Sequence, residues 1–236
     1  MRVKRAVIDS LNLSSYDVEK MFDSKDYIIE PVKSIGVFEP KRWSETFGKP
    51  LAKKKNGKWV TPIKEAKILH TYTGLTIPLK RFISNQQMQT IEFAGLHGYN
   101  ERSKWLTMLL RDKWSQLQDT RLMRVDVAID YKGNIPRRVT KKLLENRIPF
   151  KWKNTRYHKT EKEGKTNSYI DIKIYDKAKK ENLDYPLERL EFVFKGAYFN
   201  KLKLNSLDEV IKKMEKSIKK ATGVNVRIDT FLTRVS

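Results

Sequence analysis

Three stretches of the chain alternate polar and apolar side chains: Arg124-Val-Asp-Val-Ala-Ile-Asp130, Tyr169-Ile-Asp-Ile-Lys-Ile-Tyr175 and Leu187-Glu-Arg-Leu-Glu-Phe-Val-Phe-Lys195. Successive side chains on a β-strand point to opposite faces, so each stretch predicts a strand with one apolar face and one charged face. If the three strands are neighbours, one face of their sheet packs against helices. The other face then displays acids, bases and a tyrosine.

Four carboxylates fall inside these strands, although aspartate is disfavoured there. They are Asp126, Asp130, Asp171 and Glu191. Clustered carboxylates repel one another unless cations neutralise them. Hard divalent ions such as Mg²⁺ or Mn²⁺ prefer oxygen ligands of this kind. The pattern therefore favours a metal site for phosphoryl chemistry, and the alternative is a half-solvated antiparallel sheet with ordinary cross-strand ion pairs.

The rest of the chain mixes strands and helices without an internal repeat or a low-complexity linker. Asn56-Gly57 is typical of a tight β-hairpin, and apolar spacing predicts helices over about 101–119 and 137–146. Residues 206–223 read as a C-terminal amphipathic helix that a capping box at Ser206 opens. We expect a single α+β domain over 1–236, with a largely antiparallel central sheet, a polar catalytic face and helices packed on the other face.

Composition narrows the class of function. The 236 residues include no cysteine, which excludes disulfides and thiolate catalysis, and they carry a formal net charge of +22. A positive field of this size attracts polyanions, and nucleic acid is the first partner to consider. Since no apolar run approaches the roughly 18 residues that span a bilayer, we expect a cytoplasmic protein with no membrane partner.

One segment mixes aromatic and cationic residues as single-strand-binding surfaces do, where bases stack on rings. It includes Trp152, Lys153, Arg156, Tyr157 and Lys159. The alternative is that its aromatic residues belong to the core or to an edge strand. Lys173 and Arg124, on the polar faces of the predicted strands, are further candidates for contact with DNA.

The sequence resembles the replication initiators of rolling-circle plasmids, the Rep_trans-type initiation factors, and is more distantly similar to the replication proteins of filamentous phages. The resemblance depends on the blocks Arg124-Val-Asp-Val-Ala-Ile-Asp130, Ile174-Tyr-Asp-Lys177 and Glu188-Arg-Leu-Glu191, which follow Ile8-Asp-Ser-Leu11 in the family's order. It implies a replication initiator that nicks and rejoins one strand of DNA at an origin. A tyrosine becomes joined to the 5′ phosphate, and the free 3′ hydroxyl primes rolling-circle replication.

Carried onto this chain, the resemblance assigns a role to each matching residue. Tyr175 is the nucleophile, Lys177 lowers its pKa or holds the scissile phosphate, and Arg189 lies beside the phosphate. Asp126 and Glu191 are ligands of Mg²⁺ or Mn²⁺, with Asp130 a further candidate. Asp171 joins the ligand candidates from strand parity alone, and Tyr157 stays open as the alternative nucleophile.

Many rolling-circle enzymes bind their metal through a His-hydrophobe-His pair, and this chain departs from that pattern. Its three histidines, His70, His97 and His158, are too far apart in sequence to form one. The departure leaves a carboxylate-dependent enzyme as the interpretation. Two alternatives are a non-catalytic protein that binds DNA at an origin, and a metal-dependent nuclease or primase-like enzyme. The resemblance also suggests a helicase and a second copy of the chain as partners.

Overall fold

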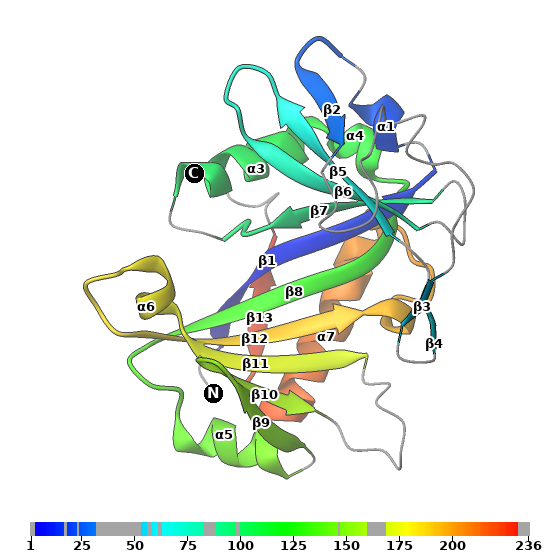
Figure 1. Cartoon of the computed structure of the whole chain (residues 1–236). Coiled ribbons are helices and arrows are strands. Elements are labelled where there is room, and N and C mark those ends of the chain that lie inside the picture. The colour runs from blue at the N-terminus through cyan, green and yellow to red at the C-terminus, as the bar shows by residue number, and fades with distance from the viewer. Residues whose placement is uncertain are drawn as a thin grey trace.

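The structure is a computed structural model that describes most of the chain, and its elements are labelled in Figure 1. The described residues are 3–16, 18–22, 24–31, 53–55, 58–60, 63–82, 88–97, 100–145, 147–159 and 169–230. None of the helices in these ranges combines the length and the apolar character that a membrane span requires.

A single large sheet organises the molecule, and its long strand β1 (Lys4–Ser15) lies near the middle. On one side the order runs β1, β8 (Arg121–Lys132), β12 (Leu187–Lys195), β11 (Ile170–Asp176), β10 (Thr155–Lys159) and β9 (Ile148–Trp152). On the other side follow β7 (Gln89–Ala94), β6 (Thr76–Phe82), β5 (Ile63–His70) and β2 (Tyr27–Pro31). All of these pairs are antiparallel, while β13 (Val226–Asp229) pairs with the start of β1 in parallel.

The three alternating stretches form the neighbouring strands β8, β12 and β11, as the sequence predicted. Their register aligns Asp130 with Arg189 and Arg189 with Tyr175. The apolar faces carry fully buried residues such as Val127, Phe192 and Ile174. The prediction of an α+β fold with a largely antiparallel sheet is confirmed.

Helices cover the apolar face of these strands. The long helix α7 (Leu207–Thr222) lies behind β8 and β12 in Figure 1 and contributes Val210, Met214 and Ile218 to the core. Helix α5 (Arg137–Leu144) packs against α7 and buries Val139 and Leu143. The opposite face of β8, β12 and β11 is therefore left for polar side chains.

The remaining helices lie elsewhere on the sheet. α1 (Val18–Met21) follows β1, α3 (Glu101–Asp112) and α4 (Trp114–Leu117) connect β7 to β8, and α6 (Lys177–Glu181) follows β11 directly. Asp176 begins α6, because its side chain accepts a hydrogen bond of 2.8 Å from the Lys179 backbone N–H. That cap fixes where β11 ends and α6 begins, so Tyr175 is held two residues before a helix.

Several local expectations needed correction. The predicted helix over 101–119 is two helices, α3 and α4, and Ser206 precedes α7 without a side-chain capping bond. Strand β1 carries a shift of register between Ile8 and Ser10 and continues as one strand to Ser15. The strands β3 (Lys53–Lys55) and β4 (Lys58–Val60) pair as the predicted hairpin requires, although Asn56 and Gly57 themselves lie outside the described residues.

Candidate functional site

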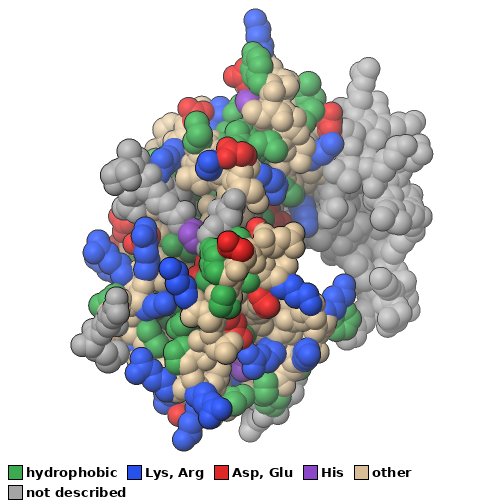
Figure 2. Space-filling view, turned by 90° about the vertical axis from the view of Figure 1, so that its left-hand side faces the viewer, with side chains coloured by type: hydrophobic (Ala, Val, Ile, Leu, Met, Phe, Trp, Pro, Cys, Tyr) green, Lys and Arg blue, Asp and Glu red, His purple; other side chains and the backbone are tan. Residues whose placement is uncertain are grey.

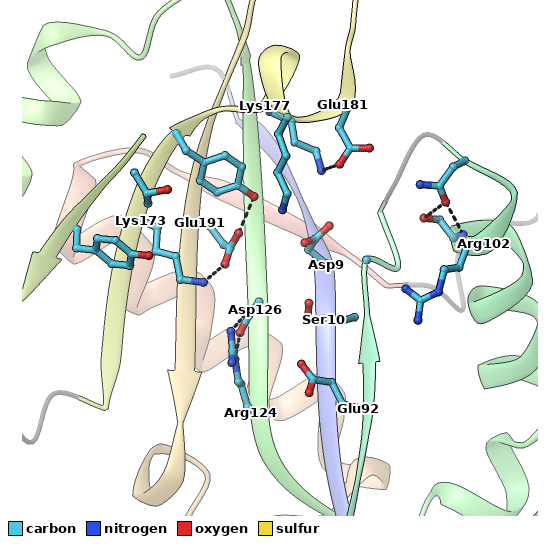
Figure 3. A pocket seen from close by; sticks show the side chains of 18 residues that line it. Asp9, Ser10, Glu92, Arg102, Arg124, Asp126, Lys173, Lys177, Glu181 and Glu191 are labelled. Atoms are coloured by element: carbon cyan, nitrogen blue, oxygen red, sulfur yellow. Dashed lines mark hydrogen bonds and ion pairs between the residues drawn. The ribbon is translucent and has the colours of Figure 1, made fainter. Parts of the chain in front are cut away.

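A pocket of about 530 Å³ opens on the polar face of the sheet, opposite α7. Its floor comes from β1, β8, β12 and β11, and its walls come from the start of α3, from α6 and from β10. Figure 3 shows carboxylates of Asp9, Glu92, Asp126 and Glu191 turned toward its interior. The lining is mainly charged, and it contains Asp9, Ser10, Glu92, Arg102, Arg124, Asp126, Tyr157, Lys173, Tyr175, Lys177, Lys180, Glu181 and Glu191.

Tyr175 and the predicted acids meet in this pocket. The Tyr175 hydroxyl donates a hydrogen bond of 2.8 Å to Glu191 Oε2, and Asp126 lies in the same lining. The contact crosses from β11 to β12, where the register pairs Lys173 with Glu191 and places Tyr175 two residues further along. Alternation on the strands predicted this convergence correctly, and the roles of the three residues stay predictions.

Each acid of the central pair is held by a cation from the same face. Arg124 donates two hydrogen bonds to Asp126, of 2.7 Å from Nε and 2.5 Å from Nη2. Lys173 Nζ donates to Glu191 Oε1 at 2.5 Å. Arg124 and Lys173, predicted to contact DNA, therefore neutralise the carboxylates of the free protein while they line the pocket (Figure 3).

Burial shifts the acid–base chemistry of the pocket. The pKa of the Tyr175 phenol is raised well above its usual range, mainly by burial and further by the negative charge of Glu191. Burial and the nearby Glu191 raise the pKa of Asp126 to about 6, against the opposing effect of Arg124. Burial would also raise the pKa of Glu191, but Lys173 and Tyr175 outweigh it and hold this pKa below its usual range. Glu191 is thus the ionised proton acceptor of the pair, and Tyr175 is a neutral donor.

Arg189, expected beside the phosphate, lies beneath the pocket and does not line it. Its side chain is fully buried and donates to Asp130 at 2.6 and 2.8 Å and to Asp9 at 3.0 Å. Burial alone would raise the pKa of Asp130, but hydrogen bonds from His97 and Arg189 hold it well below its usual range. Arg189 therefore joins β12 to β8 and β1 under Tyr175, and Asp130 is engaged in that ion network.

Two other predicted site residues have structural partners. Asp171 forms an ion pair with Lys195 and does not line the pocket. Lys177 lines the pocket, but it is almost fully buried and its Nζ binds Glu181 at 2.6 Å. The lysine that lies over the Tyr175 ring is Lys180, with its Nζ 5.3 Å from the ring centre.

The segment predicted to bind single strands is a hairpin of β9 and β10 at the edge of the sheet. Tyr157 lines the pocket and stacks on Phe150, with ring centres 4.9 Å apart, while Trp152 is 63% exposed. Lys153 is exposed in the turn, Arg156 binds Glu188 at 2.9 Å, and Lys159 is the last residue of β10. The hairpin adds exposed rings and cations to the side of the pocket.

Of the carboxylates in this pocket, Asp126 and Glu191 are the two that the resemblance assigns to a divalent ion. Among the described residues no three acids or histidines are arranged as a metal-binding group. Asp126 and Glu191 are buried oxygen donors, and the charge of Glu191 adds to burial in raising the pKa of Asp126. Since Mg²⁺ is commonly held by one or two carboxylates together with substrate phosphates and water, the pair fits a weakly held ion of this kind.

Sequence reasoning missed several residues of the pocket. Asp9 and Ser10 were given no role in the site, and Glu92, Arg102 and Lys180 belong to no motif that would single them out. Phe150 was not predicted to lie near the site either, because its stacking on Tyr157 depends on the pairing of β9 with β10. The position of Ile8-Asp-Ser-Leu11 in the family's order was the one available indication that Asp9 and Ser10 belong to the site.

Asp126→Asn is expected to stabilise the protein at neutral pH. The pKa of Asp126 is about 6 in the folded protein and near 3.8 in the unfolded chain. The folded state therefore disfavours the ionised carboxylate, so the free energy of unfolding falls as the pH rises from about 4 to about 6, and the whole cost of this charge applies at pH 7. At about 1.4 kcal/mol per pKa unit, removing the charge should add about 1–3 kcal/mol to the free energy of unfolding. Urea denaturation at pH 7 and pH 4 measures it, and the gain should be smaller at pH 4. A less stable Asn variant at pH 7 would contradict the assignment.

Comparison with solved structures finds proteins of similar fold. A rolling-circle replication initiator protein from Geobacillus stearothermophilus matches with a TM-score of 0.44 and 13% sequence identity, over 92% of this chain and 85% of that one. No family model matches the sequence, and no curated protein matches it.

Proposed function

We propose that this chain is a replication initiator that nicks and rejoins one strand of DNA through a covalent link to Tyr175. The observation that carries the proposal is the hydrogen bond of 2.8 Å from the Tyr175 hydroxyl to Glu191 in a pocket lined with cations. A hydroxyl nucleophile next to an ionised proton acceptor is the arrangement that covalent catalysis requires.

The acceptor for the Tyr175 proton follows from geometry, because the carboxylate of Glu191 already accepts a hydrogen bond from the phenol. Because burial keeps the phenol neutral, Tyr175 attacks as its proton passes to Glu191. The phenolic oxygen bonds to phosphorus, the bond from phosphorus to the 3′ oxygen breaks, and the 3′ oxygen takes up a proton from solvent. The phosphotyrosine keeps the energy of the phosphodiester bond, so attack by a 3′ hydroxyl reverses the step and rejoins the strand.

Cations of the pocket would hold the DNA phosphate. Arg124, Lys173 and Lys180 line the pocket. Asp126 and Glu191 would hold a Mg²⁺ or Mn²⁺ ion, which stabilises charge on phosphate oxygens when it is bound. Exposed rings of the β9–β10 hairpin would stack on unpaired bases next to the scissile bond. The positive net charge of the chain supports DNA as the substrate.

The test is a covalent-adduct assay. Supercoiled DNA that carries the gene and its flanking sequence is incubated with the protein and Mg²⁺ or Mn²⁺. We expect nicked circles whose 5′ end stays bound to protein in detergent, with the DNA mapped to Tyr175 by mass spectrometry and no product in a chelator. DNA binding without cleavage in any divalent ion would instead support the non-catalytic alternative. Cleavage without an adduct would support a metal-dependent nuclease.

A further inference from the structure

A second cleft, of about 1010 Å³, lies outside the tyrosine pocket. It is formed by the beginning of β1, the end of β8, the segment that leads into α5, and Tyr185. Its walls carry four cations, a buried tyrosine ring and an exposed tyrosine: Lys4, Arg5, Lys132, Arg138, Tyr131 and Tyr185. None of these residues has a place in the nicking reaction proposed above.

The cleft is strongly positive. Asp130 is the one acid among the described residues that line it, and Arg189 already neutralises that carboxylate. Lys132 and Arg138 are exposed, and neither has an acidic partner among the described residues. Figure 2 shows Lys and Arg side chains gathered over the lower part of the side of the molecule that carries α5. Unpaired cations around a concave surface favour an anionic ligand.

The cleft continues the tyrosine pocket along the same two strands. Ser10 of β1 and Asp126 of β8 are register partners in the tyrosine pocket, and beyond the intervening pair of Ile8 and Val127 the partners Val7 and Ala128 line the second cleft. From Asp126 to Lys132 the strand rises about 20 Å, at about 3.3 Å per residue. An extended ligand that leaves the tyrosine pocket in this direction therefore reaches Lys132 at the end of β8, beside which the cleft opens.

We propose that this second cleft binds the backbone of the DNA strand where it continues beyond the scissile phosphate. Lys132 and Arg138 contact its phosphates, Lys4 closes the wall with its Nζ 4.5 Å from the centre of the Tyr131 ring, and Tyr185 offers a face for a base. The choice of DNA as ligand rests on the proposed function, while the site itself rests on the charges and the shape of the cleft.

The test measures binding and not cleavage, and it uses the full chain with Tyr175→Phe so that no adduct forms. The double variant Lys132→Gln, Arg138→Gln removes two cations of the cleft. Its matched control, Lys141→Gln, Lys212→Gln, removes two exposed lysines that lie outside the cleft, one on α5 and one on α7. Affinity for a long poly(dT) strand is measured between 50 and 200 mM salt, and thermal unfolding verifies that both variants fold.

We expect the cleft variant to bind about 10- to 100-fold more weakly, since each lost contact is a charge-assisted hydrogen bond. The slope of log K against log salt should fall by about 1.4, or 0.7 for each phosphate of a single strand. The strand length protected from nuclease digestion should shorten as well, while the control changes each quantity little. An equal loss in the control, or no loss in the cleft variant, overturns the proposal. Absence of an adduct with the wild-type chain would overturn the nicking reaction and leave this measurement valid.

Discussion

Tyr175→Phe is expected to abolish the covalent adduct and lower nicking at least about 10³-fold, as loss of a nucleophile does in other covalent enzymes. The substitution removes one oxygen atom and the hydrogen bond to Glu191. The fold should therefore persist, with a change of about 1 kcal/mol in the free energy of unfolding. DNA binding should be nearly unchanged, because the cations that line the pocket remain.

The matched control is Tyr157→Phe, which removes a hydroxyl from the other tyrosine of the pocket. Tyr157 lies on β10 and stacks on Phe150, so its ring should matter more than its oxygen. We expect this variant to keep the adduct and to nick within about threefold of the wild type. If Tyr157→Phe loses the adduct and Tyr175→Phe keeps it, the nucleophile has been assigned to the wrong tyrosine.

Arg189→Met is expected to destabilise the protein by about 3–5 kcal/mol, the usual cost of leaving buried charges without a partner. The methionine leaves Asp9 and Asp130 facing each other in the space that the guanidinium filled. Arg189 helps to hold the pKa of Asp130 below its unfolded value. The ion pair therefore stabilises the wild-type fold above about pH 4, and this contribution is lost at lower pH, where Asp130 becomes protonated. The difference in the free energy of unfolding between wild type and variant should therefore become smaller in acid.

Urea denaturation measures the effect, with Arg156→Met as the control. Arg156 is an exposed cation on β10 that pairs with Glu188 on β12 of the same sheet, and its loss should cost less than about 1 kcal/mol. Adding Asp9→Asn and Asp130→Asn to Arg189→Met removes the uncompensated charges and should restore much of the stability. A small effect of Arg189→Met would mean that this arginine is free to contact a ligand.

The local pattern of the chain was enough to predict the central strands and their faces. Period-two alternation defines which side chains share a face, so once the three strands are neighbours it places Asp126, Glu191 and Tyr175 on one side of the sheet. It could not decide which acids would meet, because that depends on register. Asp171 and Asp130 lie on the same side of their strands as the pocket residues. Their positions along the strands nevertheless bring Asp171 beside Lys195 and Asp130 beside Arg189.

The sequence by itself determined an α+β protein with a polar sheet face, a strongly basic surface and a tyrosine among acids. Only the tertiary structure decided that Arg189 is buried under the site, that Asp9 of β1 joins it, and that a second positive cleft follows the first. The physical reason is that charge and strand parity are local properties of the chain. Burial, ion pairing and the shape of a cleft arise between strands that are more than a hundred residues apart in sequence, such as β1 and β12.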